Sequence, residues 1–99
     1  LATRNNLAAW RGEAGDTAGA VAAFTELLPI LERVHGPEHP YTLGARGNLA
    51  FWRGRAGDAS GAAAGLAELL PTFVRVLGPE HPDTLTVRGN LAIWRREAE

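Results

Sequence analysis

The chain has 99 residues, which is enough for one small domain, and its formal net charge is −1. A protein needs a surplus of cations to displace the counterions of nucleic acid, so this charge argues against a general affinity for DNA or RNA. The absence of cysteine excludes disulfides, and no apolar run approaches the roughly 20 residues of a membrane span. We therefore expect a protein that binds neither nucleic acid nor a membrane. The lack of cysteine does not fix the compartment, and our prediction is the cytoplasm.

Residues 1–42 and 43–84 are two copies of one sequence. They align without a gap, and 26 of the 42 positions are identical. A third copy begins at Leu85 and covers residues 85–99. Self-similarity at a fixed period indicates a repeat architecture, so we expect a single repeat domain over residues 1–99. Because Leu1 falls inside the repeated pattern, we interpret the chain as part of a longer array.

Each copy is predicted to form two helices. The first of them (helix A) begins, for copy two, near Pro40 at the end of copy one and stops near Gly57. Leu49, Trp52 and Ala56 recur at i, i+3 and i+7, which places them on one face of a helix. Pro suits the first helical position because its missing N–H would have no partner there. Gly can adopt the left-handed conformation that ends a helix. The matching positions of the other copies predict the same helix.

The second helix of each copy (helix B) is predicted over about residues 17–34 and 59–77. Its apolar face is repeated as Ala20, Phe24, Leu27, Leu28 and Leu31 in copy one, and as Ala62, Leu66, Leu69, Leu70 and Phe73 in copy two. Pro29 and Pro71 lie inside this helix, where a proline costs about 3 kcal/mol. Either the helix has a built-in kink at this point, or it breaks into two pieces.

No strand pattern competes with these helices. The predicted fold class is therefore all-α: a superhelix, or solenoid, of five helices stacked as antiparallel pairs. A single pair cannot bury both of its faces, so neighbouring repeats must pack on one another. Four glycines inside the helices of copy two each cost up to about 1 kcal/mol relative to alanine. They are Gly44, Gly47, Gly61 and Gly65.

The length of the period alone would also suit HEAT or armadillo repeats. The residues favour another family. Asn48, Leu49 and Ala50, then Gly54, Gly57, Ala62 and Leu66, followed by LGPEHPDTL, resemble the long tetratricopeptide repeat of kinesin light chains. The segment TRNNLAAWRGEAGD is similar to the repeats of large actinobacterial proteins. The resemblance implies a concave groove, lined by the A helices, that binds peptide segments, with an Asn of each helix A holding the peptide backbone.

The asparagines that match this motif are Asn6, Asn48 and Asn90. Neighbouring helices pack roughly 8–10 Å apart, and an extended peptide advances roughly 3.3 Å per residue, so successive amides could meet about every third peptide residue. Each amide offers donors and an acceptor, which suits any backbone. Phe51 and Arg55 lie on the same stripe of helix A and complete the predicted peptide-binding set. Alternatively, the asparagines bond to neighbouring helices and stabilise the stack.

The tryptophans of the three A helices recur with Leu and Ala at helical spacing, so we expect Trp10, Trp52 and Trp94 to lie in the core. The arginines that recur in the A helices could bind acidic residues of a partner, because a guanidinium matches a carboxylate. We prefer the interpretation that they pair with Glu or Asp of adjacent helices or stack on the tryptophans. The recurring positions are Arg4, Arg46 and Arg88, and Arg11, Arg53 and Arg95.

No residues suggest catalysis. His39 and His81 each lie beside a Glu, but the spacing matches no familiar metal site, and we interpret both as residues that precede the first Pro of helix A. No nucleophile is paired with a base, and an enzyme would need at least a clustered acid–base set. We therefore predict no enzymatic activity, no cofactor and no metal.

Three functions are compatible with the sequence. The leading prediction is a protein–protein interaction scaffold that binds a peptide or protein segment in the groove of the A helices. The second is self-assembly into a homo-oligomer, either head to tail or by exchange of helices, through apolar faces at the two ends of the stack. The third is the sensor or regulatory arm of a larger signalling NTPase or transcriptional regulator.

Overall fold

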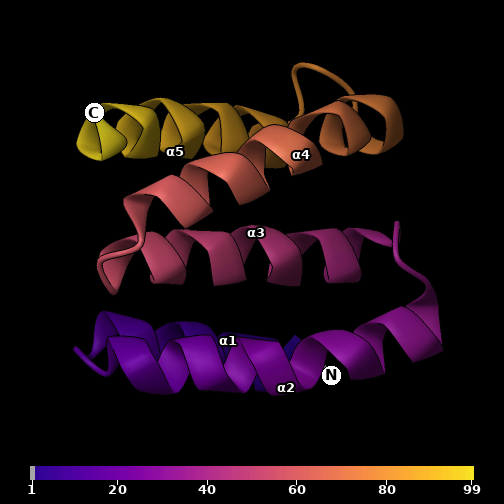
Figure 1. Cartoon of the computed structure of the whole chain (residues 1–99). Coiled ribbons are helices and arrows are strands. Elements are labelled where there is room, and N and C mark those ends of the chain that lie inside the picture. The colour runs from indigo at the N-terminus through magenta and orange to yellow at the C-terminus, as the bar shows by residue number, and fades with distance from the viewer. Residues whose placement is uncertain (1) are drawn as a thin grey trace.

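A computed structural model describes the backbone of residues 2–99 and the side chains of residues 7–99. Within that part the chain forms five helices and no strand (Figure 1). They are α1 (Ala2–Glu13), α2 (Thr17–His35), α3 (Pro40–Arg55), α4 (Ala59–Leu77) and α5 (Pro82–Ala98). The all-α prediction is confirmed, and the side chain of Asn6 lies outside the described residues.

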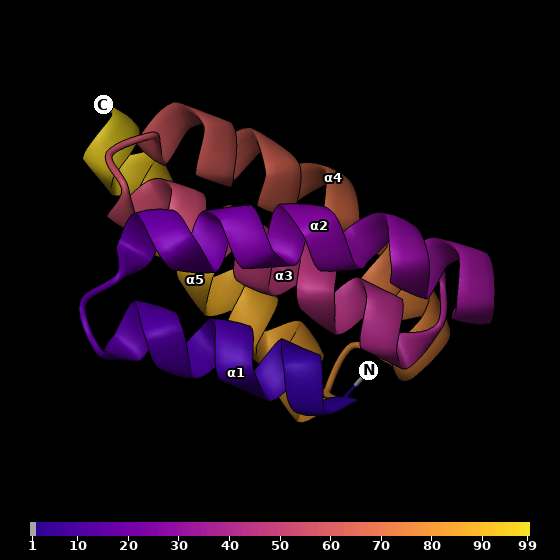
Figure 2. The same ribbon diagram turned by 90° about the horizontal axis from the view of Figure 1, so that it is seen from below.

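The helices form two layers. Each helix packs against the next one in the chain, and α3 also contacts both α1 and α5. The A helices α1, α3 and α5 therefore form one layer, and the B helices α2 and α4 form the other. Viewed from below, α2 and α4 lie above α1, and α5 crosses obliquely behind α3 (Figure 2). This is the stack of antiparallel helix pairs that the repeat predicts.

Polar side chains and glycines set the ends of the helices. Asp58 precedes α4, and its carboxylate accepts the N–H of Gly61 at 2.9 Å. His39 precedes α3 and accepts the Tyr41 N–H on its Nδ1 atom at 3.1 Å. His81 does the same at the start of α5, which confirms that these histidines begin helix A. Gly57 adopts a positive φ of 109° just after α3, a conformation that costs other residues steric strain.

The prolines inside α2 and α4 do not break them. Both helices run without interruption through Pro29 and Pro71. Each proline is exposed, and each helix bends along its length in Figure 1. A proline on the outer side of a curved helix leaves the freed carbonyl near solvent, where water can replace the lost hydrogen bond. Of the two alternatives, the kinked continuous helix is therefore correct.

The core consists of two clusters that are copies of each other. The first lies between α1, α2 and α3, and contains Ala8, Ala20, Phe24, Leu27, Leu31, Ala45, Leu49 and Trp52. The second lies between α3, α4 and α5, and contains Ala50, Ala62, Leu66, Leu69, Phe73, Val87, Leu91 and Trp94, together with Leu43. Each residue of the first cluster has its counterpart 42 positions later in the second. Because α3 contributes to both clusters, it is the central helix.

Two of the three tryptophans pack on a glycine of the preceding helix A. An atom added at Cβ of Gly12 would lie 2.5 Å from the Trp52 ring, and one at Gly54 would lie 2.5 Å from the Trp94 ring. Trp52 and Trp94 are only 4% and 8% exposed, as expected. Trp10 is 64% exposed, so its predicted place in the core is wrong. Within residues 2–99, α1 contacts α2 and α3, and no earlier helix A brings a matching glycine to Trp10.

Helix α4 is long and apolar enough to cross a membrane by length and composition alone. It packs against both α3 and α5, and its fully buried residues are core residues of the second cluster. It also carries Glu68 and Arg75 on its exposed side. The structure thus explains the apolar character of α4 by its position between two neighbours.

Candidate functional site: the groove between α3 and α5

A hollow of about 230 Å³ opens between α3 and α5 on the side of the A helices. All three helices of the second repeat interface contribute to its wall. It is lined by Gly44, Gly47 and Asn48 of α3, Leu66 and Phe73 of α4, and Asp83, Thr86, Val87 and Asn90 of α5. We call this feature the Gly44–Gly47 hollow. It lies in the groove that the sequence predicts as the peptide-binding surface.

The hollow has an apolar floor and polar walls. Leu66 and Phe73 are buried and belong to the second core cluster. Asn48 and Asn90 are half-buried and lie on neighbouring A helices. The structure therefore brings two of the three predicted asparagines to one site. The side chain of the third, Asn6, is not described.

The amides of Asn48 and Asn90 have no partner inside the described part of the chain. Among residues 7–99, neither side chain makes a hydrogen bond to another residue, and neither amide is sealed from solvent. A half-buried amide with no protein partner keeps its donors and its acceptor for water or a ligand.

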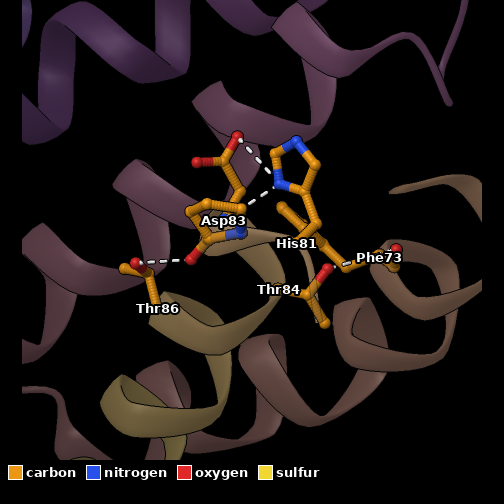
Figure 3. Close-up of polar contacts among 6 residues, drawn as sticks. Phe73, His81, Asp83, Thr84 and Thr86 are labelled. Carbon is orange, nitrogen blue, oxygen red and sulfur yellow. Dashed lines mark hydrogen bonds and ion pairs between the residues drawn. The ribbon is translucent and has the colours of Figure 1, made fainter. Parts of the chain in front are cut away.

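A polar network stands at the mouth of the hollow, at the start of α5 (Figure 3). His81 accepts the N–H of Asp83 on Nδ1 at 3.0 Å, and the Asp83 carboxylate lies 4.0 Å from the same nitrogen. The Thr86 hydroxyl donates to the Pro82 carbonyl at 3.0 Å. These contacts fix the first turn of α5 and leave the Asp83 carboxylate largely exposed to solvent.

A buried threonine ties this turn to the floor. Thr84 is fully buried, and its hydroxyl donates to the carbonyl of Phe73 at 3.4 Å. The equivalent Thr42 donates to the Leu31 carbonyl at the same distance in copy one. The start of each helix A is thus held on the preceding helix B. This contact sets the position of Asp83 relative to Phe73 beneath it.

Two other predicted peptide-binding residues lie away from the hollow. Phe51 is half-buried and packs against both core clusters, with its ring centroid 6.0 Å from that of Trp94. Arg55 is exposed, and its guanidinium carbon lies 5.8 Å from the centroid of Phe51 and 5.7 Å from that of Trp52. Phe51 therefore mainly packs between the two repeats, and the guanidinium of Arg55 lies over its ring.

The opposite face of the molecule has a different character. A second hollow lies between α2 and α4 and is lined by Arg46, Arg53 and Glu68 among other residues. Arg46 lies 3.0 Å from the Glu32 carboxylate, which is the pairing with a neighbouring helix that we preferred for the recurring arginines. The face of the B helices is therefore rich in charge. In the Gly44–Gly47 hollow, by contrast, Asp83 is the one charged residue among the lining residues that the structure describes.

Four residues that line this groove do not belong to the predicted peptide-binding set: Gly44, Gly47, Asp83 and Thr86. A signal was present for the glycines, because two glycines at i and i+3 of a helix share one face and each is unfavourable there. For Asp83 and Thr86 we find no comparable signal, since an acidic residue and a threonine are ordinary in the first turn of a helix.

Comparison with known proteins agrees with the repeat architecture. The family model described as tetratricopeptide repeat matches residues 1–70, which is more than half of the chain. A search of curated proteins found no match. Repeats of this family generally mediate protein–protein interaction and form a scaffold without catalytic machinery of their own. By the match, the period and the stacked helix pairs, the chain belongs to the tetratricopeptide repeat family.

Proposed function

We propose that this chain is an interaction scaffold that binds an extended segment of another protein along the A-helix groove. In this proposal the amides of Asn48 and Asn90 bond to the backbone of the segment, and Asn6 extends the row on α1. The kinesin-light-chain type of repeat, which the sequence resembles, is part of the proposal. Side chains of the segment would contact the floor of the Gly44–Gly47 hollow.

The observation that supports the proposal is that the amides of Asn48 and Asn90 have no hydrogen-bond partner among residues 7–99. They come from equivalent positions of neighbouring helices, line the same hollow and make no hydrogen bond within residues 7–99. If their role were to fix the helix stack, they would be expected to bond to a neighbouring helix. An extended strand offers alternating N–H and C=O groups, and an amide side chain can pair with both.

Selection of peptides tests this function. Short random peptides displayed on phage are selected against the intact chain, and the affinity of labelled binders is measured by fluorescence anisotropy. Asn48→Ala and Asn90→Ala are each expected to weaken binding by about tenfold, since each removes a hydrogen-bonding group from the contact. Thermal unfolding should change little, because neither amide has a hydrogen-bond partner to lose among residues 7–99.

A matched control comes from the opposite face. Glu68 is an exposed polar residue of α4 that lines the hollow between the B helices, and Glu68→Gln should leave the affinity unchanged. Amide NMR shifts on addition of the peptide should cluster on α3 and α5. Selected peptides that bind both asparagine variants as tightly as the parent, or that shift signals on α2 and α4, would contradict the proposal.

Self-association is a second candidate, favoured by exposed apolar side chains at both ends of the stack. Leu7 and Trp10 of α1, and Leu85 and Ile93 of α5, are all more than half exposed. A head-to-tail stack that continued the repeat would place Trp10 of one copy on position 96 of another, where Arg96 replaces the glycine found at positions 12 and 54. The arginine at this position favours other modes of self-association, such as helix exchange. Light scattering over a range of concentrations tests self-association, and a chain that stays monomeric throughout would remove this candidate.

A further inference from the structure

The Gly44–Gly47 hollow exists because two residues of α3 have no side chain. A Cβ atom added at Gly44 would meet no atom of the described residues within 4 Å. One added at Gly47 would lie 3.8 Å from the Phe73 ring, which is an ordinary van der Waals contact. The packing of this chain therefore has room for a side chain at both positions, and neither glycine is required by a neighbour.

Comparison of the copies leads to the same conclusion. Gly54, which the packing requires, has Gly12 as its counterpart in copy one. The positions that match Gly44 hold Ala2 and Thr86, and those that match Gly47 hold Asn5 and Gly89. The pair of glycines is thus peculiar to α3, although glycine is unfavourable in a helix interior. The repeat fold does not explain it.

The size of the hollow limits what it can hold. Sites for small molecules and cofactors usually measure about 300–1,000 Å³, and this hollow is smaller, at about 230 Å³. The floor formed by Leu66 and Phe73 is apolar, so an apolar group gains most from entering it. A single side chain of moderate size, presented by a backbone that lies across Asn48 and Asn90, fits both the volume and the chemistry.

The charge at the mouth specifies a second feature of the occupant. Among the described residues that line the hollow, Asp83 is the one with a formal charge, and its side chain is 65% exposed. The Nδ1 atom of His81 accepts a hydrogen bond from the Asp83 N–H, so it has no proton to give to the nearby carboxylate. The carboxylate is therefore available to a cation on the bound segment.

We propose that the Gly44–Gly47 hollow is a socket for one apolar side chain of an extended peptide that carries a Lys or Arg next to that side chain, facing Asp83. This inference rests on the function proposed above and names the class of segment that the groove selects. Gly44 and Gly47 determine specificity by leaving the socket open, and Asp83 by attracting the neighbouring cation.

Filling the socket from within tests the inference. Gly44→Leu places a side chain in the hollow, and its Cβ has free space, so the variant should fold and unfold at a temperature equal to or above that of the parent. It should bind selected peptides at least about tenfold more weakly, as expected when an anchor loses its pocket. Gly89→Leu is the matched control: its Cβ also meets nothing within 4 Å, but it does not line the hollow. It should bind like the parent.

The peptide side of the contact is tested in the same assay. One apolar residue of a selected peptide should lose about tenfold in affinity when changed to Ala, and this loss should disappear in Gly44→Leu. Asp83→Asn should lower the affinity for peptides that carry the Lys or Arg, and should leave the affinity for peptides without it unchanged. Selected peptides should accordingly share an apolar residue next to Lys or Arg.

The outcomes separate this inference from the proposed function. If the asparagine variants lose binding but Gly44→Leu keeps it, the groove binds peptides and the socket is wrong. If the asparagine variants also keep it, or no peptide is selected, both proposals are wrong. Concentration-dependent NMR shifts at Gly44 and Gly47 without any peptide would show that a second copy occupies the hollow, which would overturn the socket as well.

Discussion

The two ends of α3 use glycine in opposite ways. Near its C-terminal end, Gly54 is covered by the Trp94 ring, which lies where a side chain of its own would be. Near its N-terminal end, Gly44 and Gly47 face a hollow that no side chain of the described residues fills. Glycine is an unfavourable helix residue in both places. At Gly54, packing of the Trp94 ring offsets the cost of glycine in a helix. At Gly44 and Gly47, in our proposal, the open space is filled by a ligand.

This difference predicts different responses to the same substitution. Where an internal side chain occupies the space, adding a methyl group should destabilise the fold. Where the space is open, adding one should stabilise the fold and affect only binding. The following experiments test this contrast, beginning with the largest expected effect.

Removal of the covering ring should have the largest effect. Trp94 is 8% exposed in the second core cluster, and Trp94→Ala removes its ring and leaves a cavity above Gly54. We expect a loss of about 3–5 kcal/mol in the free energy of unfolding, measured by urea denaturation. Trp10→Ala is the control, because the exposed Trp10 ring should cost far less to remove. Equal losses would mean that packing on glycine contributes nothing special.

The next largest effect is expected for Gly54→Ala. The new methyl group would overlap the Trp94 ring, and overpacking of this kind costs about 1–3 kcal/mol. In a Trp94→Ala background the ring is gone, and the same change should become stabilising by up to about 1 kcal/mol, the helix preference of alanine. Denaturation of the four variants of this cycle gives the coupling. A Gly54→Ala effect of the same sign in both backgrounds would contradict the contact.

The sequence predicts the fold well because the repeat makes each signal appear twice. Helix ends at Gly57 and Pro40, and the apolar face of helix B, depend on local residues and need no knowledge of neighbours. Trp10 was assigned to the core because its sequence context equals that of Trp52. The exposures of Trp10 and Trp52 differ because a glycine-bearing helix covers Trp52 and not Trp10 among residues 2–99. A local sequence pattern contains no information about which face of a helix is covered.

The candidate site was predictable in part. The asparagines were found because they recur at the same position of helix A. The hollow was not found, because its existence depends on side chains that are missing from α3 and on Asp83 of α5, which comes close only in the folded chain. The stripe of helix A places Phe51 in the predicted peptide-binding set, whereas the structure packs its ring between two repeats.

A third kind of glycine should give an intermediate response. Gly61 follows the cap residue Asp58, and a side chain at Gly61 would overlap the Asp58 carboxylate. Asp58→Ala should cost about 1 kcal/mol through loss of the cap. Gly61→Ala should be nearly neutral, because its helix preference of up to about 1 kcal/mol offsets a displaced cap. Thermal unfolding of both, and of the double variant, checks this: the double variant should be more stable than Asp58→Ala alone.

The two linkers between repeats differ in a similar way: the glutamate of one linker has an arginine partner, and the matching glutamate of the other has none among residues 7–99. Glu38, in the linker before α3, accepts a hydrogen bond from Arg75 of α4. This hydrogen bond lowers the pKa of Glu38, with a smaller effect in the same direction from the positive charge of Arg75. Glu80 occupies the matching position before α5, and it has no such pair with an arginine in residues 7–99.

The smallest expected effect is therefore a pH dependence that belongs to Glu38 and not to Glu80. A carboxyl group whose pKa is lowered by folding stabilises the fold at neutral pH, and the contribution is lost as the pH falls below the ordinary pKa of a glutamate and through the lowered one. Unfolding temperatures measured from neutral to acid pH should show a slightly shallower acid decline for Glu38→Gln than for the parent. Both groups are exposed, so the difference should shrink at 1 M salt, where the screening length is about 3 Å. Glu80→Gln should follow the parent, and an equal change in both variants would mean that the contact with Arg75 does not distinguish the two linkers.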